Sequence, residues 1–223
     1  MVLIAGAMEA NAGSLTYSHH STALPDAAGP AITMLSITGT NDGTSLTFII
    51  TFANPTIEGP SSASDDAVYG FVNLDTDNDA GTGVSGSFLD TNGLQPGFGQ
   101  YSPAAHGIDA YINLTSEGDP LHGAPGLVDL VSTSTFTPIA TLPVLYVDGG
   151  GNTPSTLTFS IALSILADNQ IPLGDTGDFS VIVGNLNNAT DFLPSSVIPE
   201  PSSLGLFGLG LVSSLLLGRR LRR

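Results

Sequence analysis

The amino-acid sequence predicts an all-β fold, an antiparallel β-sandwich of the jelly-roll or immunoglobulin-like type with one hydrophobic helix at the C-terminus. Two observations favour strands. The chain of 223 residues has 27 Gly and 15 Pro but only 11% charged residues, so turn formers are common and long charged helix formers are scarce. Short apolar runs also alternate with clusters of turn residues, at a spacing typical of antiparallel sheets.

The first two predicted strands form a hairpin. Residues Ile32–Thr38 are rich in apolar and β-branched types, and the turn signal Asn41-Asp42-Gly43 follows them. The next run, Ser45–Ala53, alternates between apolar and polar residues, which predicts a strand with one buried face. That face consists of Leu46, Phe48, Ile50 and Phe52.

Six further runs complete a set of about eight strands, and one short run between them is helical in character. Ser164–Asp168 is predicted to form a single helical turn. The strands are predicted at Ala67–Leu74, Ile108–Leu114, Gly126–Phe136, Val144–Val147, Ser155–Leu163 and Asp178–Asn185.

Charge is distributed very unevenly along the chain. Residues 1–218 contain no Lys or Arg and carry all 20 Asp and Glu, so their formal charge is −20, and four C-terminal arginines bring the total to −16. A body without cations cannot neutralise phosphates, which excludes nucleic acid as an expected partner. Its carboxylates must be solvated, hydrogen-bonded or neutralised by bound cations, and divalent metal ions are the natural choice.

The most acidic loop is LDTDNDAGTG, in which Asp75, Asp77 and Asp79 occupy alternate positions directly after a predicted strand. Hard oxygen ligands at this spacing suit Ca²⁺, so we expect these three side chains to bind calcium. The loop is not an EF-hand, because Ala80 stands where that loop needs Gly and Gly86 where it needs Glu. The alternative is a solvated acidic turn without an ion.

The two ends of the chain have the character of targeting segments. Residues 1–12 contain a short apolar run, Val2–Ala7, and after Glu9 an Ala-Asn-Ala triplet, which we interpret as a signal peptide that lacks its start or as an ordinary flexible N-terminus. Residues 202–218 contain no charge, and 17 apolar residues are the lower limit for a membrane-spanning helix. The arginines that follow would hold that end of the helix in the cytoplasm. They are Arg219, Arg220, Arg222 and Arg223.

The C-terminal end resembles the PEP-CTERM sorting signal of Gram-negative bacteria. Pro199-Glu200-Pro201, one apolar helix and a terminal Arg cluster follow one another in the order typical of that signal. The resemblance implies export, anchoring in the inner membrane through the C-terminus, and processing near the motif by an exosortase-type enzyme. It also implies a final location at the cell surface or outside the cell, in the company of exopolysaccharide and biofilm components.

The body resembles a second family, the carbohydrate-binding-module-9-like or DOMON-like β-sandwich domains of exported bacterial proteins. The resemblance covers about residues 70–195 and rests on the acidic loop together with the later segments HGIDAYINL, TFSIALSILAD and NATDFLP. It implies that Asp109 faces Asp75 and Asp77 across the end of the sheet and completes the shell of an ion. In this chain an additional Ala110 separates Asp109 from Tyr111, a departure that leaves the role of the Tyr open.

These observations divide the chain into a leader (1–12), a β-sandwich domain (13–192), a linker with the Pro-Glu-Pro motif (193–201), a transmembrane helix (202–218) and a cytoplasmic tail (219–223). The chain has no G-x-S-x-G motif and no phosphate-binding loop, so we expect no enzyme. The leading hypothesis is a calcium-stabilised structural protein of the surface or matrix. The alternative is a carbohydrate-binding module for exopolysaccharide, for which Phe98 and Tyr101 are either an exposed platform or buried loop anchors.

Overall fold

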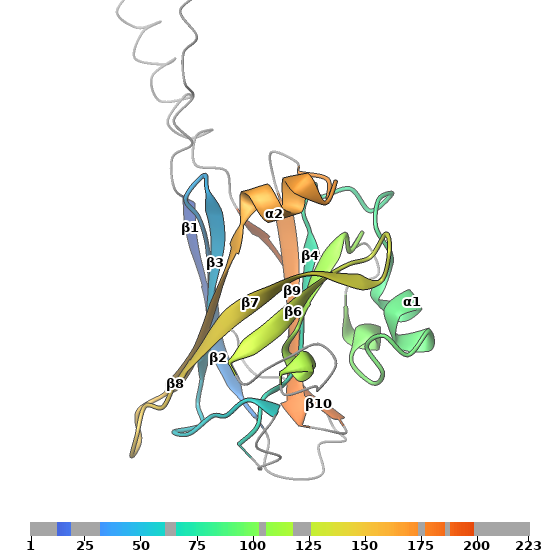
Figure 1. Ribbon diagram of the computed structural model, residues 1–223. Coiled ribbons are helices and arrows are strands. Elements are labelled where there is room, and N and C mark those ends of the chain that lie inside the picture. The colour runs from blue at the N-terminus through green and yellow to red at the C-terminus, as the bar shows by residue number, and fades with distance from the viewer. Residues whose placement is uncertain are drawn as a thin grey trace, which may run out of the picture.

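The computed structural model describes residues 13–18, 32–60, 66–102, 106–117, 126–173, 177–185 and 188–198. In these residues ten strands form one antiparallel sheet in the order β1-β2-β3-β8-β7-β6-β5-β4-β9-β10 (Figure 1). The strands are β1 (Gly13–Ser18), β2 (Met34–Asn41), β3 (Ser45–Phe52), β4 (Tyr69–Asp75), β5 (Ala110–Asn113), β6 (Leu127–Ser132), β7 (Thr137–Val147), β8 (Ser155–Ala162), β9 (Gly177–Asn185) and β10 (Asn188–Ile198). Two short α-helices, α1 (Gly86–Thr91) and α2 (Leu163–Asp168), and the 3₁₀ turns η2 (Gly99–Tyr101) and η3 (Leu114–Ser116) accompany them.

Strand β7 joins two half-sheets. Its first part pairs with β6, with Pro143 opposite Leu127, and its last part pairs with β8, with Val144 opposite Phe159. The sheet folds back on itself until its edge strands β1 and β10 come into contact, so it is nearly closed. The antiparallel β class is therefore confirmed, whereas a jelly-roll or immunoglobulin-like sandwich type stays a prediction.

The main hydrophobic core lies between the two half-sheets. The predicted hairpin is confirmed: β2 pairs with β3, and Gly43 takes the positive φ of 84° that the turn requires. The predicted apolar face of β3 is buried, and its central ring, Phe48, packs against Phe159 and Phe179 with centroid distances of 5.3 Å each. Aromatic pairs of this geometry stabilise a core beyond the area that they bury.

A second apolar cluster covers the outer face of β4, β5, β6 and β9. Leu89 of α1 and Phe98 of the following loop pack there, and the Phe98 ring meets that of Phe71 edge-on at 5.5 Å. Phe98 is 5% exposed, and the Tyr101 ring stacks on Phe192 at 5.8 Å. Of the two alternatives for Phe98 and Tyr101, the structure supports loop anchors packed on the sheet, with Phe98 buried and Tyr101 half-buried.

Several element boundaries differ from the predicted ones. Strand β7 begins well before Val144, because Pro138 and Pro143, which argue against a strand in the sequence, lie within a β7 that switches between two partners. Strand β10 runs to Ile198 and pairs with β9 through two register shifts, so it occupies the first part of the predicted linker. The sequence does not predict this strand, because Pro194 and Ser195 interrupt the alternation of apolar and polar residues.

The predicted leader and the predicted tail fall outside the described residues. Those residues that are described contain no helix of sufficient length and apolar character to cross a membrane. The predicted transmembrane segment 202–218, the motif at Pro199–Pro201 and the terminal arginines are therefore not placed by the structure.

Candidate metal centre

Three of the four predicted calcium ligands lie together at one end of the sheet. Asp75, Asp77 and Asp109 each offer a carboxylate oxygen, and these oxygens lie within 4.8 Å of one another. Asp75 and Asp109 are only 1% and 3% exposed, while Asp77 is half-buried. The cluster could hold a metal ion, because close carboxylates in a buried setting repel one another unless a cation or protons lie between them.

The pairing of β4 with β5 creates this proximity. Asp75 is the last residue of β4, Leu74 lies opposite Ala110, and the Asp109 N–H donates to the Leu74 carbonyl at 2.8 Å. Two acidic residues that are 34 positions apart in the sequence thereby meet at the same sheet end. The predicted neighbourhood of Asp109 with Asp75 and Asp77 is what the structure shows.

Asp79 lies outside this group of three. Its side chain is exposed, and its Oδ1 accepts a hydrogen bond from the Gly81 N–H at 2.8 Å. The backbone of Asp79 nevertheless shapes the cluster, because its N–H donates to Asp75 Oδ1 at 3.2 Å and to Asp77 Oδ1 at 3.0 Å. Asp79 therefore orients the two carboxylates through its main chain.

Gly107 seats the acidic loop, and sequence reasoning missed this role. Its N–H donates to Asp75 Oδ2 at 3.1 Å, and a Cβ at this position would lie 2.4 Å from the Asp79 carbonyl oxygen and 2.5 Å from that of Thr82. A side chain here would force the loop away from the start of β5. The only signal in the sequence was a Gly two residues before Asp109, which is weak by itself.

Thr76 holds the other buried carboxylate. Its N–H and its Oγ1 donate to Asp109 Oδ2 at 2.9 and 3.0 Å, and the same hydroxyl contacts the Pro172 carbonyl. The loop is thus tied both to the residue before β5 and to the segment after α2. Thr82 binds the neighbouring carboxylate, since its hydroxyl donates to Asp77 Oδ1 at 3.0 Å.

Burial dominates the electrostatics of the two hidden carboxyl groups. Desolvation raises the pKa of Asp75 above its ordinary 3.8, and hydrogen bonds from Gly107 and Asp79 and the neighbouring His106 offset only part of this. Desolvation also raises the pKa of Asp109, despite the bonds from Thr76, and the negative charge of Asp77 adds to both effects. A bound cation would reverse this, since it favours the ionised form.

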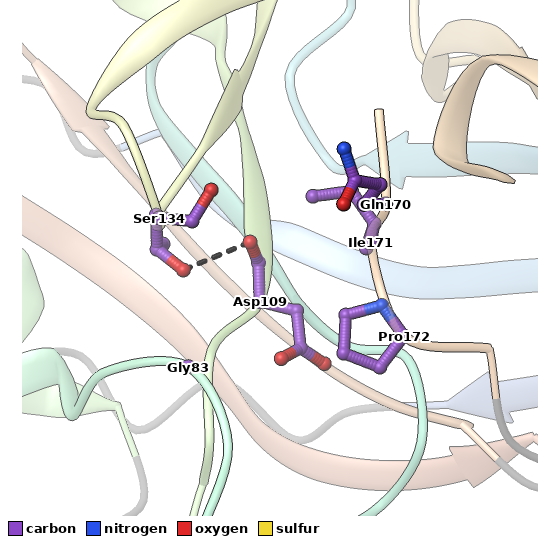
Figure 2. A pocket seen from close by; sticks show the side chains of 7 residues that line it. Gly83, Asp109, Ser134, Gln170, Ile171 and Pro172 are labelled. Atoms are coloured by element: carbon purple, nitrogen blue, oxygen red, sulfur yellow. Dashed lines mark hydrogen bonds between the residues drawn. The ribbon is translucent and has the colours of Figure 1, made fainter. Parts of the chain in front are cut away.

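A pocket of about 320 Å³ opens beside the cluster, and Asp109 belongs to both (Figure 2). In Figure 2 the Asp109 carboxylate lies between Gly83 and Pro172, with Ser134 and Gln170 on the opposite walls. Ser134 and Gln170 are exposed and polar, so the pocket offers hydroxyl and amide groups to solvent. Its full lining is Gly83, Asp109, Thr133, Ser134, Gln170, Ile171 and Pro172.

Behind the cluster, His106 packs against β9. Its Nε2 lies 3.7 Å from Asp178 Oδ2, and its Nδ1 lies 3.5 Å from the Ser180 hydroxyl. Ser180 is fully buried, so this contact holds β9 against the loop and presents no hydroxyl at the surface. The neighbouring Gly107 donates to Asp75, which links this packing to the acidic cluster.

Residues 197–223 match the family model for the PEP-CTERM protein-sorting motif. Neither a curated protein nor a solved structure shows significant similarity to the chain. The resemblance of the body to carbohydrate-binding-module-9-like or DOMON-like domains therefore stays a prediction. This sorting motif supports secretion with a transient C-terminal membrane anchor and sorting of the protein to the surface by an exosortase-type enzyme. Residues 197–223 of this chain are therefore a PEP-CTERM sorting motif.

Proposed function

We propose that this chain is an exosortase-processed protein of the cell surface or extracellular matrix, whose β-body is non-catalytic and stabilised by calcium. The sorting motif at residues 197–223 supports the route of the protein. The role of the body is inferred from its own residues. A structural role fits a sheet whose buried polar groups tie loops together and whose acidic surface keeps the protein soluble.

The acidic cluster is the single observation that carries the calcium proposal. Asp75 and Asp109 are nearly inaccessible to solvent, yet residues 1–218 contain no Lys or Arg that could neutralise them. Hard carboxylate oxygens are the ligands of Ca²⁺ and Mg²⁺, and an irregular loop site suits the flexible, higher coordination of Ca²⁺ better than the strict octahedron of Mg²⁺. The ion would hold residues 75–83 against the start of β5.

A second function, recognition of a carbohydrate, is favoured by a different observation. Phe88 of α1 and Phe136 of the β6–β7 turn are 41% and 37% exposed, and their rings stack at 5.7 Å. The same turn contributes Ser134 to the polar pocket at Asp109. An exposed aromatic surface beside hydroxyl and amide groups suits a sugar, which presents both an apolar face and hydroxyls.

The melting temperature of the full chain with calcium, with magnesium and with a chelator tests the calcium proposal. A ligand at 100 times its Kd stabilises the native state by about 2.7 kcal/mol. For a domain of this size that amounts to a rise of about 5–10 °C. We expect this rise with calcium and a much smaller one with magnesium.

Variants of the cluster make the test specific. Asp75→Asn and Asp109→Asn should each remove most of the calcium-induced rise, whereas Asp168→Asn, an exposed carboxylate at the end of α2, should leave it intact. The two cluster variants should also be non-additive, since each removes a ligand from the same ion. An equal loss in all three variants would mean that calcium acts on the general negative charge, and the proposal would fail.

A further inference from the structure

One half-sheet contains β2, β3, β8 and the end of β7, and among the described side chains its outer face has no charged residue. Strands β2, β3, β7 and β8 contain no Asp, Glu, Lys, Arg or His, although the whole chain carries 20 acidic residues. The carboxylates nearest to these strands in the sequence, Asp42 and Asp148, follow the last residues of β2 and β7 and so lie at strand ends. An uncharged area is unusual on a protein whose residues 1–218 carry a formal charge of −20, so it calls for a physical reason.

Hydroxyl groups and aliphatic side chains fill this area, which we call the hydroxyl face. It consists of the outward side chains of β2, β3 and β8 and of the end of β7, and the strand register aligns them in rows. One row contains Thr38, Ile49, Thr158 and Leu145, and the next contains Thr47 and Ser160, whose hydroxyl oxygens lie 2.8 Å apart.

The aliphatic members of the hydroxyl face are well exposed. Ile49 is 39%, Leu145 60% and Val147 46% exposed, which places three of the seven large exposed hydrophobic side chains of the described residues on this one surface. The two α-helices lie elsewhere in Figure 1, α2 at the end of the sheet and α1 beside the second half-sheet. Exposed aliphatic groups gathered on one face indicate a contact surface.

We infer that the hydroxyl face binds a second copy of this chain, face to face. Two copies with a net charge of −16 each repel one another, so a contact between them must exclude carboxylates from its centre. The hydroxyl face is the uncharged surface that meets this requirement. Its Thr and Ser hydroxyls both donate and accept hydrogen bonds, so the face is complementary to itself under two-fold symmetry.

The size of the face predicts a reversible contact. Four strands about 4.8 Å apart and about seven residues long cover roughly 19 by 23 Å, or about 450 Å² per copy. Two such faces bury about 900 Å², which is below the roughly 1,200 Å² at which stable specific interfaces begin and within the range of weak, transient contacts. The dimer should therefore form at the high local concentration of a surface and dissociate on dilution.

Because the natural chain has no cysteine, single-cysteine variants of the full chain can test this inference with a short bis-maleimide cross-linker. Ile49→Cys, Thr158→Cys and Leu145→Cys lie along one row, so at least one should lie near the two-fold axis and give a cross-linked dimer. Leu173→Cys, on a side chain that is 47% exposed and outside the hydroxyl face, is the matched control and should stay monomeric. The tail is common to all four variants and cannot favour one position.

Two further measurements separate a specific dimer from collisions. Added salt screens the repulsion between the copies, so the dimer yield should rise severalfold between low and physiological ionic strength. Leu145→Asp in the Thr158→Cys background should abolish the dimer, whereas Leu173→Asp should not.

Equal cross-linking at the control position, or no dimer at any salt concentration, would overturn the inference. So would a polysaccharide that protects the face cysteines from the maleimide while the protein stays monomeric, since the face would then bind glycan and not a second copy.

Discussion

At Asp75 and Asp109, burial disfavours the ionised form of the carboxyl group, whereas a cation between the two groups would favour it. Desolvation is the largest effect on both groups and raises their pKa. Asp42, in the exposed β2–β3 turn, is the opposite case. Hydrogen bonds from the side chain and N–H of Thr44 and from the Ser45 N–H hold the pKa of Asp42 well below its usual range.

These shifts predict a characteristic pH dependence of the metal-free protein. A carboxyl group with a raised pKa in the folded state binds protons more tightly there than in the unfolded state. Its contribution to the free energy of unfolding is fully present below about pH 3.8 and is lost as the pH rises through the raised pKa. In chelator, the double variant Asp75→Asn/Asp109→Asn should therefore gain several degrees in melting temperature over the natural chain between about pH 4 and pH 7.

Asp42→Asn provides the control for this measurement. Because the pKa of Asp42 is lowered, its contribution is present above about pH 3.8 and is lost only as the pH falls further. The difference in melting temperature between Asp42→Asn and the natural chain should therefore stay constant between about pH 5 and pH 7. If the melting temperature of the double cluster variant also differed from that of the natural chain by a constant amount, Asp75 and Asp109 would not destabilise the metal-free protein at neutral pH, and the prediction would fail.

At the scale of elements, the acidic loop depends on close backbone contact with the segment before β5. Val84 and Ile108 form an isolated bridge, and Gly83 takes a positive φ of 62° where its Cα faces the Ile108 carbonyl. Gly107 lies against the middle and the last part of the loop, at the carbonyls of Asp79 and Thr82. The second half of the loop is thus seated on the segment before β5 at two residues that have no side chain.

Substitution at Gly107 should show how much calcium binding depends on the position of the loop, because it changes the packing of the loop and keeps every carboxylate. Gly107→Ala would push the Asp79 and Thr82 carbonyls away, and we expect a loss of about 1–3 kcal/mol in stability, as for other overpacked sites. The response to calcium should weaken as well, although every carboxylate is retained. Gly81→Ala is the control, since its Cβ would meet only the movable Asp79 side chain, at 3.0 Å, and should cost about 0.5 kcal/mol or less. Equal effects of the two variants, in denaturant unfolding and calcium titration, would contradict this model.

The same elements show how far the sequence predicted the fold. Strict alternation of apolar and polar residues predicted β3, because a period of two is typical of a strand with one buried face. The alternate side chains of Leu46, Phe48, Ile50 and Phe52 all lie in the core. Strands β7 and β10 were predicted only in part or not at all, since prolines and register shifts break that period. Asp75 and Asp77 were found from their spacing. Thr76 and Gly107 act through a backbone contact, which no local pattern records.

For the whole molecule, the separation of charge along the chain is the organising feature. The acidic body, with a formal charge of −20, precedes an uncharged segment and a cluster of four arginines. Arginines remain on the cytoplasmic side of a membrane, so the body would lie on the far side, where an acidic surface is well solvated and where extracellular calcium is available. The sheet itself extends to Ile198, directly before the Pro-Glu-Pro motif. The last described strand therefore reaches the motif at which processing would begin.

This arrangement predicts a definite mature form. In the sequence, the two prolines of Pro199-Glu200-Pro201 favour an extended segment that cannot pair as a strand interior, which is the form we expect a membrane enzyme to process. The protein recovered from the outer surface of its natural host should lack the mass of the residues after about Pro199, as intact-mass spectrometry would show. Replacement of Pro199, Glu200 and Pro201 by Ala should leave the tail attached and the protein in the inner membrane. Pro194→Ala, within β10 and upstream of the motif, should be processed normally. Intact tails on the surface form of the natural chain would refute processing, because the apolar segment would then have crossed the envelope with the body.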